Sequence, residues 1–170
     1  MRNNTRGLVI HVFVGLIIFL LAFLINLSKA VREIVYGNLI FRIIISLVPI
    51  LLYYNFAKLL SKRQSPKLDY LSGNLIVFFG LILFLFGFLL TGRDFFSSGI
   101  GTRAFKFPSE IFLTPQIYMV KVLRLPYNAI SLLIFTLLPS LIYGFSLRVS
   151  REKIRRQRSY RRNSRRRYES

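Results

Sequence analysis

Residues 71–90 read LSGNLIVFFGLILFLFGFLL, twenty positions without a single charged side chain. A helix of this length spans about 30 Å, the thickness of the hydrocarbon core of a bilayer. The stretch therefore predicts a transmembrane helix. Three other stretches have a similar length and an apolar composition, namely residues 8–27, 39–60 and 127–147. Together they predict an all-α integral membrane protein whose four transmembrane helices form a bundle.

The composition agrees with this class and excludes others. The 170-residue chain is 54% hydrophobic, yet it carries 25 Lys and Arg against six Asp and Glu, for a net charge of +19. Soluble domains contain only about 45–50% apolar residues even when Gly is counted. Long apolar runs separated by cations reconcile both properties. A basic soluble domain that binds nucleic acid is excluded as the main body of the protein.

The distribution of cations predicts the orientation of the four spans. With the N-terminus inside, the cytoplasmic segments hold seventeen Lys and Arg and the outer segments hold seven. The positive-inside rule then predicts that both termini are cytoplasmic, and we expect the membrane to be a bacterial plasma membrane. The prediction depends on the tail after residue 147, which supplies eleven of the seventeen. The first span is too long for a signal-peptide core of about 7–15 residues and is expected to remain as an anchor.

The chain divides into a transmembrane domain, residues 1–147, and a basic tail, residues 148–170. Residues 92–126 are expected to form a long outer loop between the third and fourth spans, and this loop is unusually hydrophobic. Residues 114–125 are predicted to form either an amphipathic helix in the membrane interface or a re-entrant element. A loop resting on the outer rim of the bundle is the third alternative.

Small residues recur at helical intervals in two of the spans. The third span has glycines seven residues apart and the fourth has small residues four apart, so each set lies on one helix face. The residues are Gly73, Gly80 and Gly87 in the third span and Thr136, Ser140 and Gly144 in the fourth. We expect these faces to close the bundle. The alternative is a contact with another membrane protein or with a second copy of the chain.

The residue types that catalysis and metal binding require are scarce. The sequence has no cysteine and a single histidine, His11, and all six carboxylates lie outside the predicted spans. Zinc sites generally need three or four ligands from these residue types. The sequence therefore predicts no catalytic residue, no metal site and no cofactor, and His11 is expected to be a hydrogen-bonded residue near the inner interface.

Arg42 falls about one turn inside the outer end of the second span. Asp94 follows the third span and Glu33 precedes the second, so both carboxylates are expected on the same side of the membrane. We interpret Arg42 either as a side chain that snorkels to the headgroups or, with Asp94, as a contact for an anion or a lipid headgroup.

The tail is the most basic part of the chain, with eleven cations and two carboxylates. Its beginning contains good helix formers and is expected to continue the fourth helix, while its end is expected to be disordered without an anionic partner. Its candidate binding residues are Arg151, Lys153, Arg155, Arg156, Arg158, Arg161, Arg162, Arg165, Arg166 and Arg167. Three partners compete: anionic lipids, an acidic protein surface, and RNA, DNA or the ribosome.

The function predicted from these features is that of a membrane-embedded accessory or partner-binding subunit without enzymatic activity. The first alternative is a small transporter or lipid-handling protein. The second is a membrane anchor whose basic tail contacts RNA or the ribosome.

Overall fold

The computed structural model describes the backbone of residues 2–60, 66–96 and 103–168 and, along the last helix, the side chains as far as Gln157. Most of these residues lie in helices, and no strand occurs among them. The α-helices are α1 (Arg2–Leu27), α2 (Lys29–Gly37), α3 (Leu39–Phe56), α4 (Asn74–Thr91), α5 (Arg103–Phe112), α6 (Thr114–Val122) and α7 (Ala129–Tyr168). The 3₁₀ segments η1 (Ala57–Leu59), η2 (Pro66–Gly73) and η3 (Gly92–Phe96) lie between them.

Four helical stretches are long and apolar enough to cross a membrane. They are Asn3–Leu27, Leu39–Leu59, Leu68–Thr91 and Ala129–Gln157. The predictions of an all-helical chain and of four membrane-crossing stretches are therefore confirmed. The third stretch begins earlier than predicted because η2 leads directly into α4. The fourth belongs to a longer helix, since α7 continues to Tyr168, into the part of the tail that we expected to be disordered.

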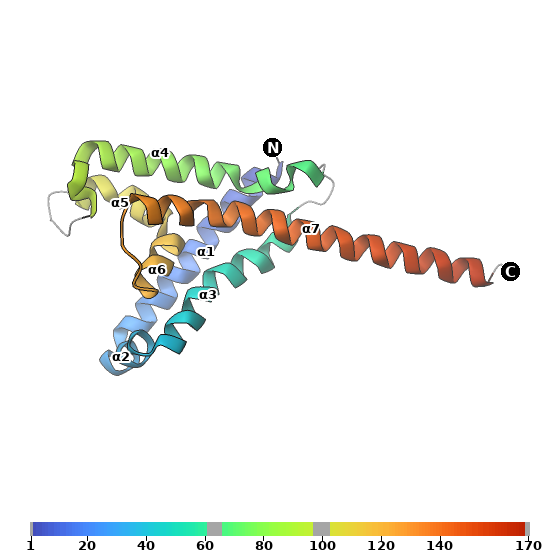
Figure 1. Ribbon diagram of the computed structural model, residues 1–170, viewed down its shortest axis with the longest axis horizontal. Helices are drawn as coiled ribbons and strands as arrows, with labels where there is room; N and C mark the ends of the chain where they lie inside the picture. Colours follow the sequence, from blue (N-terminus) through green and yellow to red (C-terminus); the bar gives the residue numbers. More distant parts are fainter. Residues whose placement is uncertain (1, 61–65, 97–102, 169–170) are drawn as a thin grey trace.

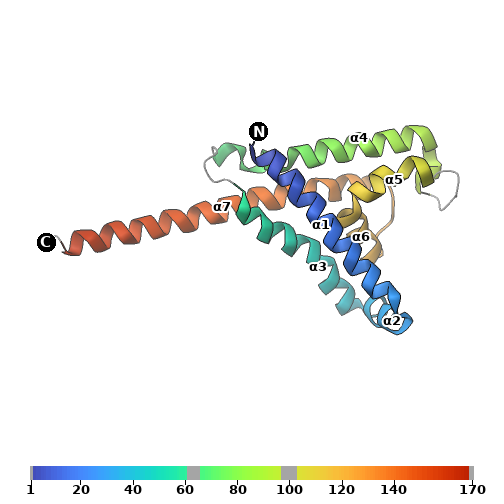
Figure 2. The same ribbon diagram turned by 180° about the vertical axis from the view of Figure 1, so that it is seen from behind.

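The long helices are arranged in two pairs that diverge (Figures 1 and 2). Helices α1 and α3 contact each other and form one pair, and α4 and α7 form the other. The pairs meet near the N-terminus, where η2 contacts both α1 and α7. Away from this end the pairs separate, and α5 and α6 occupy the space between them.

The residues that we expected to form an outer loop contain the two short helices α5 and α6. Helix α5 packs along α4, and α6 contacts α1, α3 and α7. Pro115 lies in the first turn of α6, where the absence of a backbone N–H costs nothing. Seven of the nine residues of α6 are buried, whereas an interfacial amphipathic helix leaves one face open. The surroundings of α6 are therefore those of a helix inside the protein.

The connection between the first two spans is also helical, and its ends are set by two capping side chains. The Ser28 hydroxyl accepts a hydrogen bond from the backbone N–H of Val31 at the start of α2. The Asn38 side chain accepts one from the N–H of Ile40 at 2.8 Å and so starts α3. Ser and Asn are among the favoured residues at helix N-caps.

Candidate functional site

The buried ends of α5 and α6 create a requirement for hydrogen-bond donors. The last carbonyl groups of a helix have no partner within that helix. In a membrane protein no water in the hydrocarbon core replaces the missing partners, so side chains must do so. The polar residues of the long helices meet this requirement.

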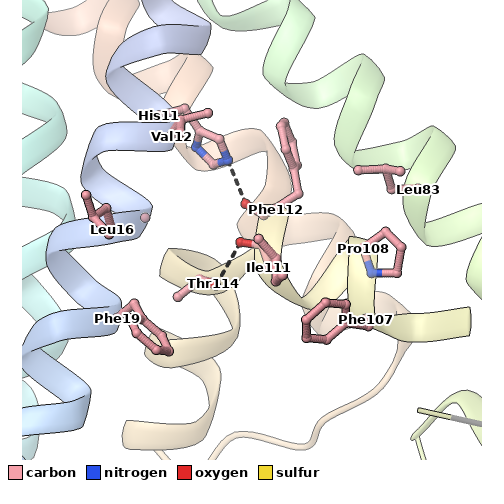
Figure 3. Close-up of a pocket in the computed structure, with 11 residues that line it drawn as sticks. His11, Val12, Leu16, Phe19, Leu83, Phe107, Pro108, Ile111, Phe112 and Thr114 are labelled. Carbon is pink, nitrogen blue, oxygen red and sulfur yellow. Dashed lines mark hydrogen bonds between the residues drawn. The ribbon is translucent and has the colours of Figure 1, made fainter. Parts of the chain in front are cut away.

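His11 forms a hydrogen bond with a carbonyl group at the end of α5. Its Nε2 lies 2.8 Å from the carbonyl oxygen of Phe112, and its Nδ1 lies 2.6 Å from the hydroxyl of Tyr53. A carbonyl only accepts hydrogen bonds, so Nε2 carries the proton and donates. In the neutral ring Nδ1 is then an acceptor, and the Tyr53 hydroxyl donates to it. Figure 3 shows His11 directed toward Phe112, so one imidazole joins α1 and α3 to the α5–α6 segment.

Arg42 likewise donates hydrogen bonds to carbonyl groups at the end of α6. Its Nε donates to the carbonyl of Val122 at 2.9 Å, and its Nη2 donates to the carbonyl of Leu123 at 3.1 Å. A cation at a helix C-terminus also interacts favourably with the helix dipole. The start of α3 and the end of α4 lie at different corners of the molecule, so the structure does not bring Arg42 and Asp94 together. A role for either residue in anion binding stays a prediction.

The small residues of the third and fourth spans face partners within the chain. A Cβ added to Gly73 would lie 2.6 Å from the Ser140 Cα, and one added to Gly80 would lie 3.0 Å from a methyl group of Thr136. The two faces thus adjoin each other where α4 and α7 meet. Gly87 instead faces the ring of Phe95, and Gly144 faces the ring of Tyr70.

A buried ion pair fixes α7 where it leaves the other helices. The guanidinium of Arg151 donates from Nε and Nη2 to the two carboxylate oxygens of Asp69, each at 2.9 Å. The side chain of Asp69 is only 3% exposed and that of Arg151 is 20% exposed. Two parallel bonds of this kind fix both distance and direction.

The structure describes the side chains of only some of the remaining basic residues of α7. Lys153, Arg155 and Arg156 are exposed. The side chains of Arg158, Arg161, Arg162, Arg165, Arg166 and Arg167 lie outside the described part of the chain, although the backbone there is helical. Arg151 thus has a partner within the chain, whereas the next three basic side chains face outward.

The arrangement offers binding and positioning rather than acid–base chemistry. In the described part of the chain, no three His, Cys, Asp or Glu side chains lie close enough to hold a metal ion. Comparison with protein-family models, with curated proteins and with solved structures finds no match to this chain. The interpretation below depends on the geometry of the chain itself.

Several residues of these contacts were not predicted from the sequence. The ion pair joins Asp69 to Arg151, which are 82 positions apart, and Gln116 is fully buried beside Tyr53 although it lies in the expected loop. A signal for the ion pair was present, because Asp69 is the one carboxylate that our topology placed in the inner loop. The burial of α6 had only a compositional signal, the high apolar content of residues 92–126.

Proposed function

We propose that this chain is a non-catalytic multi-pass membrane protein, an accessory subunit that holds a basic helix at the cytoplasmic face for an acidic protein partner. The observation that carries the proposal is the continuity of α7 from Ala129 to Tyr168, with the Arg151–Asp69 ion pair at the point where the helix leaves the others. The positive-inside rule supports the cytoplasmic location of this end.

A re-entrant position of the α5–α6 segment is part of the same proposal. Helix α5 begins beside the end of α4, since Gly87 faces the backbone of Phe105. The segment then reaches Gly80 through Leu113, and α6 ends at Arg42, near α2. This course supports a segment that enters the membrane from the outer side and returns to it, rather than one that rests on the rim.

The direction of α7 favours a macromolecular partner over lipid headgroups. The helix projects well beyond the other elements (Figure 1). The eighteen residues from Arg151 to Tyr168 extend over about 27 Å. Electrostatic attraction to a membrane surface decays within about 8 Å at physiological ionic strength, so a helix that continues along the membrane normal carries its last cations beyond the reach of lipid headgroups.

The helical register gathers several cations on one face. Positions 151, 155, 158, 162 and 165 follow each other at intervals of four and three residues, and all are arginines. Such intervals place residues along one side of a helix. A preformed helix with an ordered stripe fits an acidic protein groove, whereas arginine-rich segments that bind RNA commonly fold on binding.

Two variants of the full chain with equal charge loss test this proposal. The stripe variant replaces Arg155, Arg158, Arg162 and Arg165 by Gln, and the control replaces Lys153, Arg156, Arg161 and Arg167 by Gln. Partners are captured by crosslinking in native membranes and compared with the unmodified chain. We expect the stripe variant to lose a stoichiometric partner that the control retains. Equal loss in both variants, or loss after nuclease treatment, contradicts docking to an acidic protein.

A further inference from the structure

An apolar cavity that is open at the protein surface lies between α1, α4 and α5. Its volume is about 660 Å³, and it is lined by Val12, Leu16 and Phe19 of α1, by Leu83 of α4 and by Phe107 and Ile111 of α5, among others. Figure 3 shows these side chains directed toward a common space. Its α1 wall belongs to a stretch that is long and apolar enough to cross a membrane. In a membrane, a lipid hydrocarbon chain is the molecule available to occupy this cavity.

A second cavity of about 390 Å³ lies near α2 and the end of α6, away from both chain termini. It has a different lining, with Asn26, Tyr36, Tyr118, Lys121 and Arg124 beside apolar residues. Two cations and three neutral polar side chains line it, and none of its lining residues is acidic. These cations make the cavity a candidate anion site, although the Lys121 ammonium lies 5.4 Å from the centre of the Tyr127 ring, outside the lining.

The two cavities follow each other along the same helices. Gly15 and Phe19 of α1 line the first cavity, and Ala22 and Asn26 line the second. Their intervals of four, three and four residues place them on one face of α1. Helix α6 repeats the pattern, with Thr114 in the first cavity and Tyr118 one turn later in the second. Together the cavities form a site that is apolar at one end and cationic at the other.

A buried hydroxyl lies at the cationic end. Tyr118 is only 8% exposed, and its hydroxyl makes no hydrogen bond of good geometry in the described part of the chain, although the Tyr36 side chain lies close to it. Burial, with Tyr36 nearby as a smaller cause, raises the pKa of Tyr118 well above its ordinary value. The phenol therefore keeps its proton and remains a donor. A buried polar group with poor hydrogen bonding is rare and needs an explanation, which a bound anion would supply.

Arg124 follows the C-terminal end of α6, at a position where glycine is the usual residue. Its φ is 55°, in the left-handed region. The N–H of Leu125 donates to the carbonyl of Val120 and the N–H of Arg124 to that of Lys121, which is the Schellman pattern at a helix end. A non-glycine residue is strained there, so the backbone gains nothing from an arginine. The guanidinium donates to the carbonyl of Tyr36 at 3.2 Å, and this bond uses one of its five N–H groups.

We propose that this site binds an anionic phospholipid, with the phosphate held by Lys121, Arg124 and the Tyr118 hydroxyl and one acyl chain lying along α1 toward His11. Guanidinium binds phosphate in a bidentate manner, and the apolar cavity begins where the headgroup site ends. This inference is independent of the basic helix and its partner.

The headgroup assignment is tested by native mass spectrometry of the full chain with phosphatidylglycerol and phosphatidylcholine. We expect preferential retention of phosphatidylglycerol. The K121Q/R124Q variant should reduce that preference about tenfold, the effect of losing one charge-assisted hydrogen bond. The control R32Q removes an exposed cation of α2 outside the site and should leave the preference unchanged. Equal preference in K121Q/R124Q and the unmodified chain overturns the assignment.

A glycine variant separates binding from folding. Arg124→Gly removes the guanidinium but suits the left-handed backbone, so its thermal midpoint should equal or exceed that of the unmodified chain. The phosphatidylglycerol preference should nevertheless fall, by no more than in K121Q/R124Q. Retention of the preference in this well-folded variant overturns a role for Arg124.

The chain assignment is tested with phosphatidylglycerol that carries a diazirine in one acyl chain. We expect crosslinks at the residues that line the apolar cavity. Leu16→Trp fills that cavity and should remove them, whereas Leu24→Trp, an exposed position of the same helix outside the lining, should not. If inorganic phosphate competes for the cationic end while no acyl crosslink forms in the cavity, the site takes a free anion and the lipid proposal is wrong.

Discussion

Several polar side chains in the interior of this protein donate hydrogen bonds to backbone carbonyl groups. His11 bonds Phe112, Arg42 bonds Val122 and Leu123, and Tyr143 donates to Gly7 at 3.1 Å. Each bond joins elements that are distant in sequence. Loss of such a donor in a buried place leaves an acceptor without a partner, which costs more than the bond itself contributes.

The bond network of His11 gives the first prediction. His11→Phe keeps an aromatic ring but removes both hydrogen bonds, so the free energy of unfolding should fall by about 1–3 kcal/mol. The measurement is unfolding in mixed micelles followed by circular dichroism. Because Tyr53 is one of the partners, adding Tyr53→Phe should cost less in the His11→Phe background than alone. Strict additivity of the two changes contradicts the network.

Substitution of Gln116 should not lower the free energy of unfolding, in contrast to substitution of His11. Gln116 is fully buried, and neither amide atom makes a hydrogen bond of good geometry among the described residues, although the Tyr53 hydroxyl lies close to the side chain. Gln116→Leu removes a desolvated amide at similar volume, so it should be neutral or stabilising in the same assay. A loss of more than about 1 kcal/mol means that the amide has a partner, such as a buried water molecule.

Arg42 should matter for stability through the two carbonyl groups that it serves. Arg42→Gln should lower the free energy of unfolding by about 1.5–3 kcal/mol, the usual value of hydrogen bonds to a charged group. Arg42→Lys keeps the charge but not the two parallel donors and should lie in between. If Arg42→Gln unfolds at the same midpoint as the unmodified chain, the two hydrogen bonds do not contribute to stability and Arg42 only snorkels to the headgroups.

At the scale of elements, the contact of α7 with the end of η2, just before α4 begins, depends on the absence of a side chain at Gly73. An added Cβ meets the Ser140 backbone at 2.6 Å, so Gly73→Ala must displace one helix and should destabilise the protein by about 1–3 kcal/mol. Gly37 lies at the end of α2 with nothing within 4 Å of an added Cβ. Gly37→Ala is therefore the control, with a change within about 0.5 kcal/mol. Equal effects of the two substitutions contradict the packing described.

The elements differ in how well the sequence alone predicts them. The four spans are predictable because length and apolarity suffice for a membrane helix. Helical spacing determines which small residues share a face, but it did not predict that Gly87 would face Phe95 or that Gly144 would face Tyr70. For the α5–α6 segment the sequence left three alternatives open, because both helices are short and the seven buried residues of α6 show no clear helical periodicity. The partners of His11 and Arg42 depend on where that segment lies, so sequence reasoning could not find them.

At the scale of the whole molecule, the basic end of α7 should determine orientation. Truncation after Arg151 keeps the ion pair with Asp69 but removes nine of the seventeen cations predicted to be inside, leaving eight against seven. Orientation in the membrane should then become mixed. The natural chain has no cysteine, so Ala30→Cys gives a single reporter for an impermeant maleimide in intact cells. Complete labelling of both the full and truncated chains contradicts a role of the tail.

The position of the α5–α6 segment also has a consequence for biogenesis. The segment precedes α7 in the chain, yet α6 packs against α7 as well as against α1 and α3. Its binding place is therefore incomplete until the last span has been synthesised and released into the bilayer. With the re-entrant position proposed above, the segment therefore completes its packing only after α7 has been made, as a late step of assembly. His11 and Arg42 lie in spans made earlier, so they lack these carbonyl partners until the α5–α6 segment has been made and has packed.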